Sequence, residues 1–166
     1  MDSNVIDIDH IDGLTAQQPS SHMCFACGVE NNAGLQMKFF NDGPNACRAD
    51  FVLDDRYQSF PGRMHGGIIA VILDEAMGRA ALSGNLERMM VTAKMEIRYR
   101  QTTPLFQPLT VKARLEKDRG RLATASAEVQ LADGTIVVEA TATLAAIPAE
   151  ELAKINPDYV GWRVYP

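Results

Sequence analysis

Two features of the sequence suit chemistry at a carbonyl group: a histidine followed by two glycines, and an aspartate further along. The run His65-Gly66-Gly67 stands where a loop turns into a predicted helix over residues 66–82. The first N–H groups of a helix have no partner inside it and favour negative charge. Because glycine has no Cβ, a carbonyl oxygen can approach that backbone closely. The run fits an oxyanion hole, although by itself a glycine pair before a helix is more often a tight turn.

Asp74 is a carboxylate that this helix leaves without a partner. The first two turns are apolar on every side, which is typical of a helix buried all round, so we expect Asp74 to be buried or half-buried. The residues three and four positions away cannot neutralise it: Ala70, Val71, Met77 and Gly78. Glu75, by contrast, has Arg79 four residues further on. A buried carboxylate without a partner is costly or has a raised pKa, so Asp74 is the better functional candidate.

The elements that position these residues follow from hydrophobic patterning and from turn residues. We expect strands over residues 35–40, 47–53, 89–99, 109–115, 123–131 and 136–145, and a short acidic helix near 148–154. Alternating apolar residues in the later strands indicate a sheet with one covered face. One buried helix and a run of antiparallel strands predict an α+β fold in which the sheet curls around the helix.

Composition points to one globular domain. The chain has 166 residues, of which 46% are hydrophobic, and its longest apolar run, residues 68–73, is far shorter than a membrane span. A net charge of −5 argues against nucleic-acid binding. Three cysteines cannot all pair, and no targeting leader is visible before Lys38, the first lysine or arginine, so we expect a cytoplasmic protein. We divide the chain into a polar lead-in (1–23), the domain (24–147), and a short helix with a tail (148–166). We expect the lead-in to pack loosely or only against a partner subunit.

The helix and its surroundings resemble the hotdog-fold thioesterases, in particular the PaaI-like branch, over residues 22–147. The matching residues are His65-Gly66-Gly67 followed by Leu73-Asp74-Glu75-Ala76-Met77-Gly78, the run Cys24-Phe25-Ala26-Cys27-Gly28 with Asn31 and Gly34-Leu35, Pro61-Gly62-Arg63-Met64-His65, and Val91-Thr92-Ala93 with Ile97-Arg98-Tyr99. The resemblance implies a hotdog fold, an antiparallel sheet wrapped around one long central helix. It also implies hydrolysis of acyl-CoA thioesters.

The resemblance assigns three catalytic roles. Asp74 would be the nucleophile or the general base, and the sequence leaves both open. The N–H of Gly66 would bind the thioester oxygen, and Thr92 would orient the water or the carboxylate. Coenzyme A would enter as part of the substrate, and no cofactor or metal is expected.

Five further residues are expected to bind substrate: His65, Gly67, Gln58, Ser59 and Arg121. Some relatives carry an asparagine six residues before the motif histidine; here that residue is Ser59, with Gln58 beside it as a substitute. Arg121 belongs to a basic turn that could hold the phosphates of coenzyme A, although a solvated hairpin fits equally well. His65 at a helix entrance is more often a structural residue.

Spacing along the helix argues for a site built from two copies of the chain. Gly66 and Asp74 are eight residues apart, and this spacing corresponds to about 12 Å along the helix axis. An attacking group must come within about 3.5 Å of the carbonyl. We therefore expect a homodimer with shared active sites. We also expect two such dimers to assemble with one another. The alternative function is a non-catalytic acyl-CoA or acyl-ligand binding protein with the same fold.

The pair Cys24 and Cys27, with His22 two residues earlier, is the other motif that can carry chemistry. Structural zinc takes four ligands, usually from two such pairs, and this chain has only one pair. A redox role is disfavoured because no βαβ pattern surrounds the pair. We expect these cysteines to be small buried residues in a packed loop.

Overall fold

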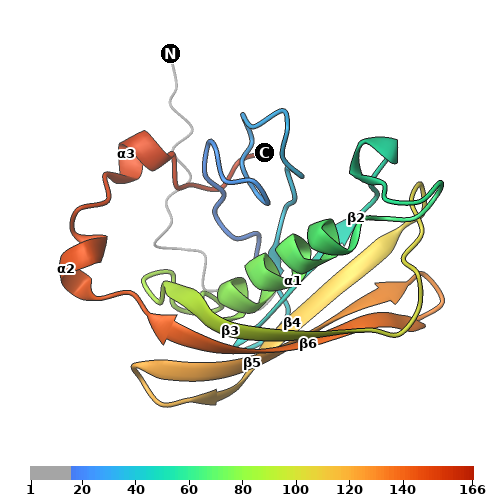
Figure 1. Cartoon of the computed structure of the whole chain (residues 1–166). Helices are drawn as coiled ribbons and strands as arrows, with labels where there is room; N and C mark the ends of the chain where they lie inside the picture. Colours follow the sequence, from blue (N-terminus) through green and yellow to red (C-terminus); the bar gives the residue numbers. More distant parts are fainter. Residues whose placement is uncertain (1–15) are drawn as a thin grey trace.

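A six-stranded antiparallel sheet curves around one long helix, α1, in the computed structural model, which describes residues 16–166. The strand order is β1-β2-β4-β5-β6-β3. The strands are β1 (Phe40–Asn41), β2 (Ala46–Phe51), β3 (Met90–Tyr99), β4 (Leu109–Asp118), β5 (Leu122–Leu131) and β6 (Ile136–Ala146). The helices are η2 (Asp55–Tyr57), α1 (Gly66–Ala80), α2 (Ala149–Leu152) and α3 (Pro157–Val160). Figure 1 shows α1 lying in the hollow of the sheet, so the expected α+β hotdog architecture is confirmed.

Helix α1 begins at Gly66 as predicted and ends at Ala80, two residues early. Its last turn tightens, because the N–H groups of Ala81 and Leu82 bond to carbonyls three residues back. One face of the helix packs into the apolar core with the sheet, through Ile69, Ile72, Leu73, Ala76 and Met77. Within residues 16–166, the sheet does not cover the opposite face (Figure 1).

Strand β3 runs antiparallel to α1 along an edge of the sheet. At one end, the Tyr99 hydroxyl donates to the carbonyl of Gly66 over 2.8 Å. At the other end, a Cβ placed on Gly78 would lie 3.9 Å from the Met90 carbonyl oxygen. Within the described residues β3 pairs only with β6, so its second edge is open.

The first expected strand is wrong over most of its length. Only Phe40 of residues 35–40 joins the sheet. The N–H groups of Leu35 and Met37 instead donate to carbonyls of Phe25 and Ala26. Gln36 between them has a φ of 50°, which breaks the extended conformation that a strand needs.

The lead-in also packs more tightly than expected. Residues 1–15 lie outside the described part of the chain, but Gln18 and Ser20 are each 1% exposed. The Gln18 side chain donates to the side chain of Asn41 and to the carbonyl of Arg79 at the end of α1. The expectation of loose packing therefore fails for the described residues 16–23, because polar residues there satisfy buried groups of the domain. No helix among residues 16–166 is long and apolar enough to cross a membrane.

Candidate active site

A cavity of about 380 Å³ opens beside the start of α1. Its walls come from the loop before the helix, from the helix itself and from the end of β3. Among the lining residues are Ser59, Phe60, Met64, Gly66, Tyr99 and Thr103. None of the lining residues is an aspartate or a glutamate.

The two glycines at the helix start differ in what their N–H groups do. The Gly67 N–H donates to Nδ1 of His65 over 2.9 Å, so His65 caps the helix. The Gly66 N–H makes no hydrogen bond with any residue of the described chain. It is therefore the free donor at the helix N-terminus, where the aligned peptide dipoles favour a developing negative charge. The structure places Gly66 at the cavity and gives His65 and Gly67 a capping contact.

Tyr99 is a site residue that the sequence reasoning did not single out. Its hydroxyl holds the carbonyl of Gly66, and a Cβ on Gly66 would lie 3.4 Å from that hydroxyl oxygen. Partial burial raises the pKa of Tyr99, so the hydroxyl keeps the proton that it donates. In the sequence, the alternation of Arg98, Tyr99 and Arg100 indicates only a solvated strand face. It gives no sign that the Tyr99 hydroxyl contacts Gly66.

Asp74 is exposed, so the expectation that it is buried is wrong for the single chain. An apolar pattern on every side of a helix does not show which face the sheet covers, and Asp74 lies outside the face of α1 that packs into the described core. The expected lack of a partner is confirmed, because Asp74 has no hydrogen bond or ion pair with any described residue. Glu75 pairs with Arg79 at 2.7 Å, as predicted.

Thr92 lies at the same level of the molecule as Asp74. Gly78 is packed beside Met90. Asp74 is four residues before Gly78, about 6 Å back along the axis of α1. Thr92 is two residues after Met90, about 6.6 Å along β3 in the same direction. Thr92 is half-buried, and the pairing of β3 with β6 is irregular between Thr92 and Lys94. Asp74 lies at the middle of α1 and Thr92 near the start of β3, so both residues are remote from Gly66.

The remaining expected binding residues divide between the two ends of β3. Ser59 lines the cavity, whereas the side chain of Gln58 turns back to accept the N–H of Gly62 at 3.2 Å. The Gln58 side chain therefore stabilises its own loop. Arg121 is exposed in the β4–β5 turn, and its carbonyl accepts the N–H of Ala146 next to the start of β3. It does not meet Gly66 in the single chain.

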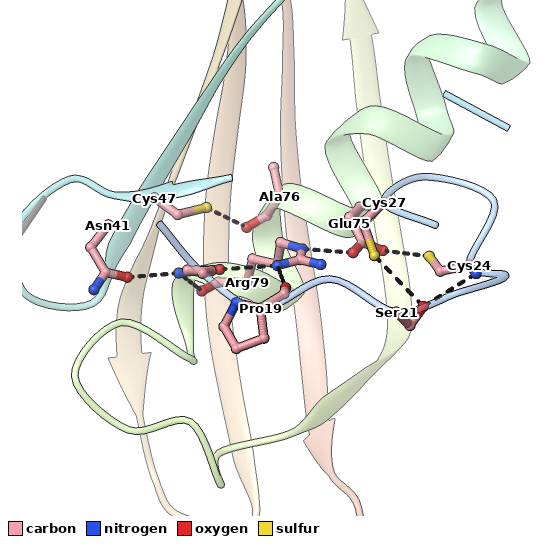
Figure 2. Close-up of polar contacts among 10 residues, drawn as sticks. Pro19, Ser21, Cys24, Cys27, Asn41, Cys47, Glu75, Ala76 and Arg79 are labelled. Atoms are coloured by element: carbon pink, nitrogen blue, oxygen red, sulfur yellow. Dashed lines mark hydrogen bonds and ion pairs between the residues drawn. The ribbon is translucent and has the colours of Figure 1, made fainter. Parts of the chain in front are cut away.

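A second polar cluster lies on α1 beyond Asp74. Figure 2 shows Cys24 and Cys27 facing Glu75, with Arg79 on the far side of the carboxylate. Hydrogen bonding from Cys24 and the charge of Arg79 lower the pKa of Cys27. Arg79 is 2% exposed and stacks over the rings of Phe39 and Trp162.

Comparisons with known proteins identify the domain that holds the cavity. Residues 61–138 match the Thioesterase superfamily model. The chain is 36% identical over 137 residues to acyl-coenzyme A thioesterase THEM4 of Mus musculus, a match that covers 81% of this chain and 58% of that protein. The chain thus spans less than two thirds of the length of this curated relative.

Solved structures agree with that match. The crystal structure of a thioesterase superfamily protein, 29% identical, superimposes with a TM-score of 0.70 over 87% of this chain and 68% of the other. A Streptococcus mutans protein crystallised with acetyl-CoA shares 21% identity, with a TM-score of 0.58 over 62% of this chain and 82% of its own. The chain therefore has the hotdog fold, its residues 61–138 match the thioesterase superfamily, and the resemblance seen in the sequence is confirmed.

Proposed function

We propose that this protein hydrolyses acyl-CoA thioesters, releasing a carboxylic acid and coenzyme A. The observation that carries the proposal is the free N–H of Gly66, which stands at a cavity on the N-terminus of α1. Such a donor stabilises charge that develops on a carbonyl oxygen, and removing one donor of this kind from an enzyme costs about a hundredfold to a thousandfold in kcat. The match to acyl-coenzyme A thioesterases supports this substrate class.

The reaction needs a nucleophile or a base, and Asp74 is the proposed group. In one route its carboxylate attacks the thioester carbon, the C–S bond breaks, the coenzyme A thiolate takes a proton, and water then cleaves the mixed anhydride. In the other route Asp74 takes a proton from water as that water attacks the same carbon, the C–S bond then breaks, and the coenzyme A thiolate takes up the proton. Thr92, at the level of Asp74, is proposed to orient the water or the carboxylate. The Gly66 N–H binds the oxyanion in both routes.

Two copies of the chain are proposed to share each site. Gly66 and Asp74 stand eight residues apart on one helix, about 12 Å along its axis, and no carboxylate lines the cavity of the single chain. The uncovered face of α1 carries small residues and Asp74: Gly67, Ala70, Val71 and Gly78 are exposed or half-buried there. A second copy packed on this face, with its β3 against the open edge of β3, would bring its own Asp74 toward Gly66. Assembly of two such dimers stays a prediction.

This pairing also gives Arg121 a proposed role. In an antiparallel pair of β3 strands, the start of one strand lies beside the end of the other. Arg121 adjoins the start of β3, and Gly66 adjoins its end. Arg121 would then lie toward the partner's cavity, where its guanidinium can pair with phosphates of coenzyme A.

The test is a panel of acyl-CoAs that vary in chain length and aromaticity, with release of free thiol as the readout. We expect hydrolysis of at least one substrate by the wild type and none by Asp74→Asn. Binding of the panel without thiol release would instead favour the alternative, a non-catalytic acyl-CoA binding protein.

A further inference from the structure

Three groups that ligate metals meet between the turn at residues 24–28 and the middle of α1. They are Cys24 Sγ, Cys27 Sγ and a carboxylate oxygen of Glu75, and all three atoms lie within 4.8 Å of one another. Cys24 Sγ is 3.7 Å from Oε2 of Glu75. We propose that Cys24, Cys27 and Glu75 bind one Zn²⁺ ion, with water as the fourth ligand. The site is separate from Gly66, and the proposed hydrolysis does not use it.

The distance between the Cys24 sulfur and the Glu75 oxygen fits tetrahedral zinc. With Zn–S near 2.3 Å and Zn–O near 2.1 Å, a tetrahedral angle puts sulfur and oxygen about 3.6 Å apart. The observed distance from Cys24 Sγ to Glu75 Oε2 is 3.7 Å. Two thiolates and one carboxylate form a donor set that zinc takes readily, and three protein ligands with one water is a known arrangement of zinc.

The turn is built so that both cysteines face the helix. The Gly28 N–H closes one helical turn on the carbonyl of Cys24 at 2.8 Å, which sets the two thiols on one side. A Cβ on Gly28 would lie 2.3 Å from the same carbonyl oxygen, so only glycine fits there. Ser21 accepts the Cys24 N–H at 3.2 Å, and its Oγ lies 4.0 Å from Cys27 Sγ.

The charges around the cluster balance when the ion is bound. Nε of Arg79 donates to Oε1 of Glu75, which leaves Oε2 for the metal. Two thiolates, the carboxylate, the guanidinium and Zn²⁺ then sum to zero. The metal-free cluster with two neutral thiols also sums to zero, so Zn²⁺ replaces two thiol protons without adding buried charge. Nη2 of Arg79 is buried and meets no geometric hydrogen-bond acceptor among the described residues.

The site is open to ions from one side, and His22 is not part of it. Cys24 is half-buried and the Glu75 side chain is 23% exposed, whereas Cys27 forms the inner wall. His22 instead packs against Gly161, where a Cβ would meet its ring at 2.3 Å. The sequence could suggest His22 as a ligand but not Glu75, because Glu75 is 51 residues away from Cys24 along the chain.

Titration with metal tests the proposal on the whole chain, reduced and stripped of metal. Co²⁺ is the spectroscopic probe, followed by Zn²⁺. We expect one ion per chain, an intense near-ultraviolet thiolate-to-cobalt band with the visible bands of tetrahedral Co²⁺, and loss of both when Zn²⁺ displaces it. Zinc should also raise the Tm and protect two of the three thiols from a disulfide reagent.

Variants assign the ligands. Cys24→Ser and Cys27→Ser should abolish the thiolate band. Glu75→Gln should weaken zinc binding by at least about tenfold to a hundredfold, which is the loss when a residue that only hydrogen-bonds to a metal ligand is changed. The matched control is Cys47→Ala, because Cys47 is buried on β2, its thiol donates to the Ala76 carbonyl, and it is not one of the three clustered ligand groups. That variant should bind one ion like the wild type.

Three results would overturn the proposal. The first is a reduced wild type that gives no thiolate band and retains no zinc, a measurement that does not depend on whether any variant folds. The second is loss of the band in Cys47→Ala while its Tm is unchanged. The third is a wild type that fails to bind metal and forms a Cys24–Cys27 disulfide in air, identified by mass spectrometry, which would make the pair a redox couple. None of these readouts uses thioesterase activity.

Discussion

The Tyr99 hydroxyl donates a hydrogen bond to the carbonyl of Gly66, which joins the last residue of β3 to the first residue of α1. The contact fixes the residue whose N–H is free at the cavity. An N–H donor that is already held in position does not have to move when negative charge develops on the substrate. Tyr99 is therefore a positioning residue for the proposed oxyanion hole.

Tyr99→Phe removes that hydroxyl and nothing else. One neutral hydrogen bond is worth about 0.5–1.5 kcal/mol, so we expect kcat to fall roughly twofold to tenfold while KM changes little. Steady-state kinetics with an acyl-CoA substrate measure both. The control is Tyr159→Phe, because Tyr159 is 85% exposed on α3. Equal losses in the two variants would contradict a positioning role.

Asp74→Asn should leave the fold intact, because Asp74 is exposed and has no partner among the described residues. We expect its kcat to fall by at least about a hundredfold, the scale of losing a general base, with an unchanged Tm. Glu75→Gln is the contrasting change, since it breaks a largely buried pair with Arg79. It should lower the Tm but reduce kcat far less. Wild-type turnover by Asp74→Asn would remove Asp74 from the mechanism.

Thr92→Ala tests whether the hydroxyl acts in the transition state. A group that orients water or a carboxylate contributes mainly there, so kcat should fall while KM stays nearly constant. Thr92→Ser keeps the hydroxyl and should recover most of the activity. A rise in KM alone would make Thr92 a binding residue.

Gln18 gives a prediction about stability. Its amide donates to Asn41 and to the carbonyl of Arg79 in a buried setting. Gln18→Ala leaves those acceptors without this donor, which should cost about 1–3 kcal/mol of unfolding free energy. Urea denaturation measures the loss. Gln36→Ala, which removes one exposed hydrogen bond to Val29, should cost far less. Equal costs would mean that the lead-in does not stabilise the domain.

Local pattern was enough to predict much of the fold. The glycines at 66 and 67 mark the start of α1, and β3, β5 and β6 begin and end within one residue of expectation. The pair of Glu75 with Arg79 follows from helical spacing alone. β4 runs three residues beyond its expected end at 115, where the pairing with β5 shifts register.

Contacts between segments that are far apart in the sequence could not be predicted from local patterns. Polar composition predicted a loose lead-in, yet Gln18 is buried because it meets Asn41 and the end of α1. Glu75 joins Cys24 only once the chain folds back across the helix. The exposure of Asp74 was missed because an apolar helix face looks the same whether a sheet or a second chain covers it.

The last prediction tests the shared site by mixing two inactive variants. Gly66→Pro deletes the proposed oxyanion donor, and the helix should tolerate it. That N–H has no partner within the described chain, proline is common at the first helical position, and His65 already has the extended ψ of 134° that a following proline requires. Asp74→Asn deletes the carboxylate. Each variant alone should fold, dimerise and be inactive.

Refolding the two variants together in equal amounts should restore activity if each site takes Gly66 from one chain and Asp74 from the other. Half of the dimers are then mixed, and each mixed dimer holds one intact and one doubly damaged site, so recovery should reach about a quarter of wild type for a two-fold interface. The chains must be unfolded and refolded together, because a dimer interface need not exchange subunits spontaneously. A mixture that stays inactive, although size-exclusion chromatography shows dimers, would place both residues in a site within one chain. The spacing of Gly66 and Asp74 along α1 makes that outcome difficult, because one bound thioester would have to reach both ends of about 12 Å of helix.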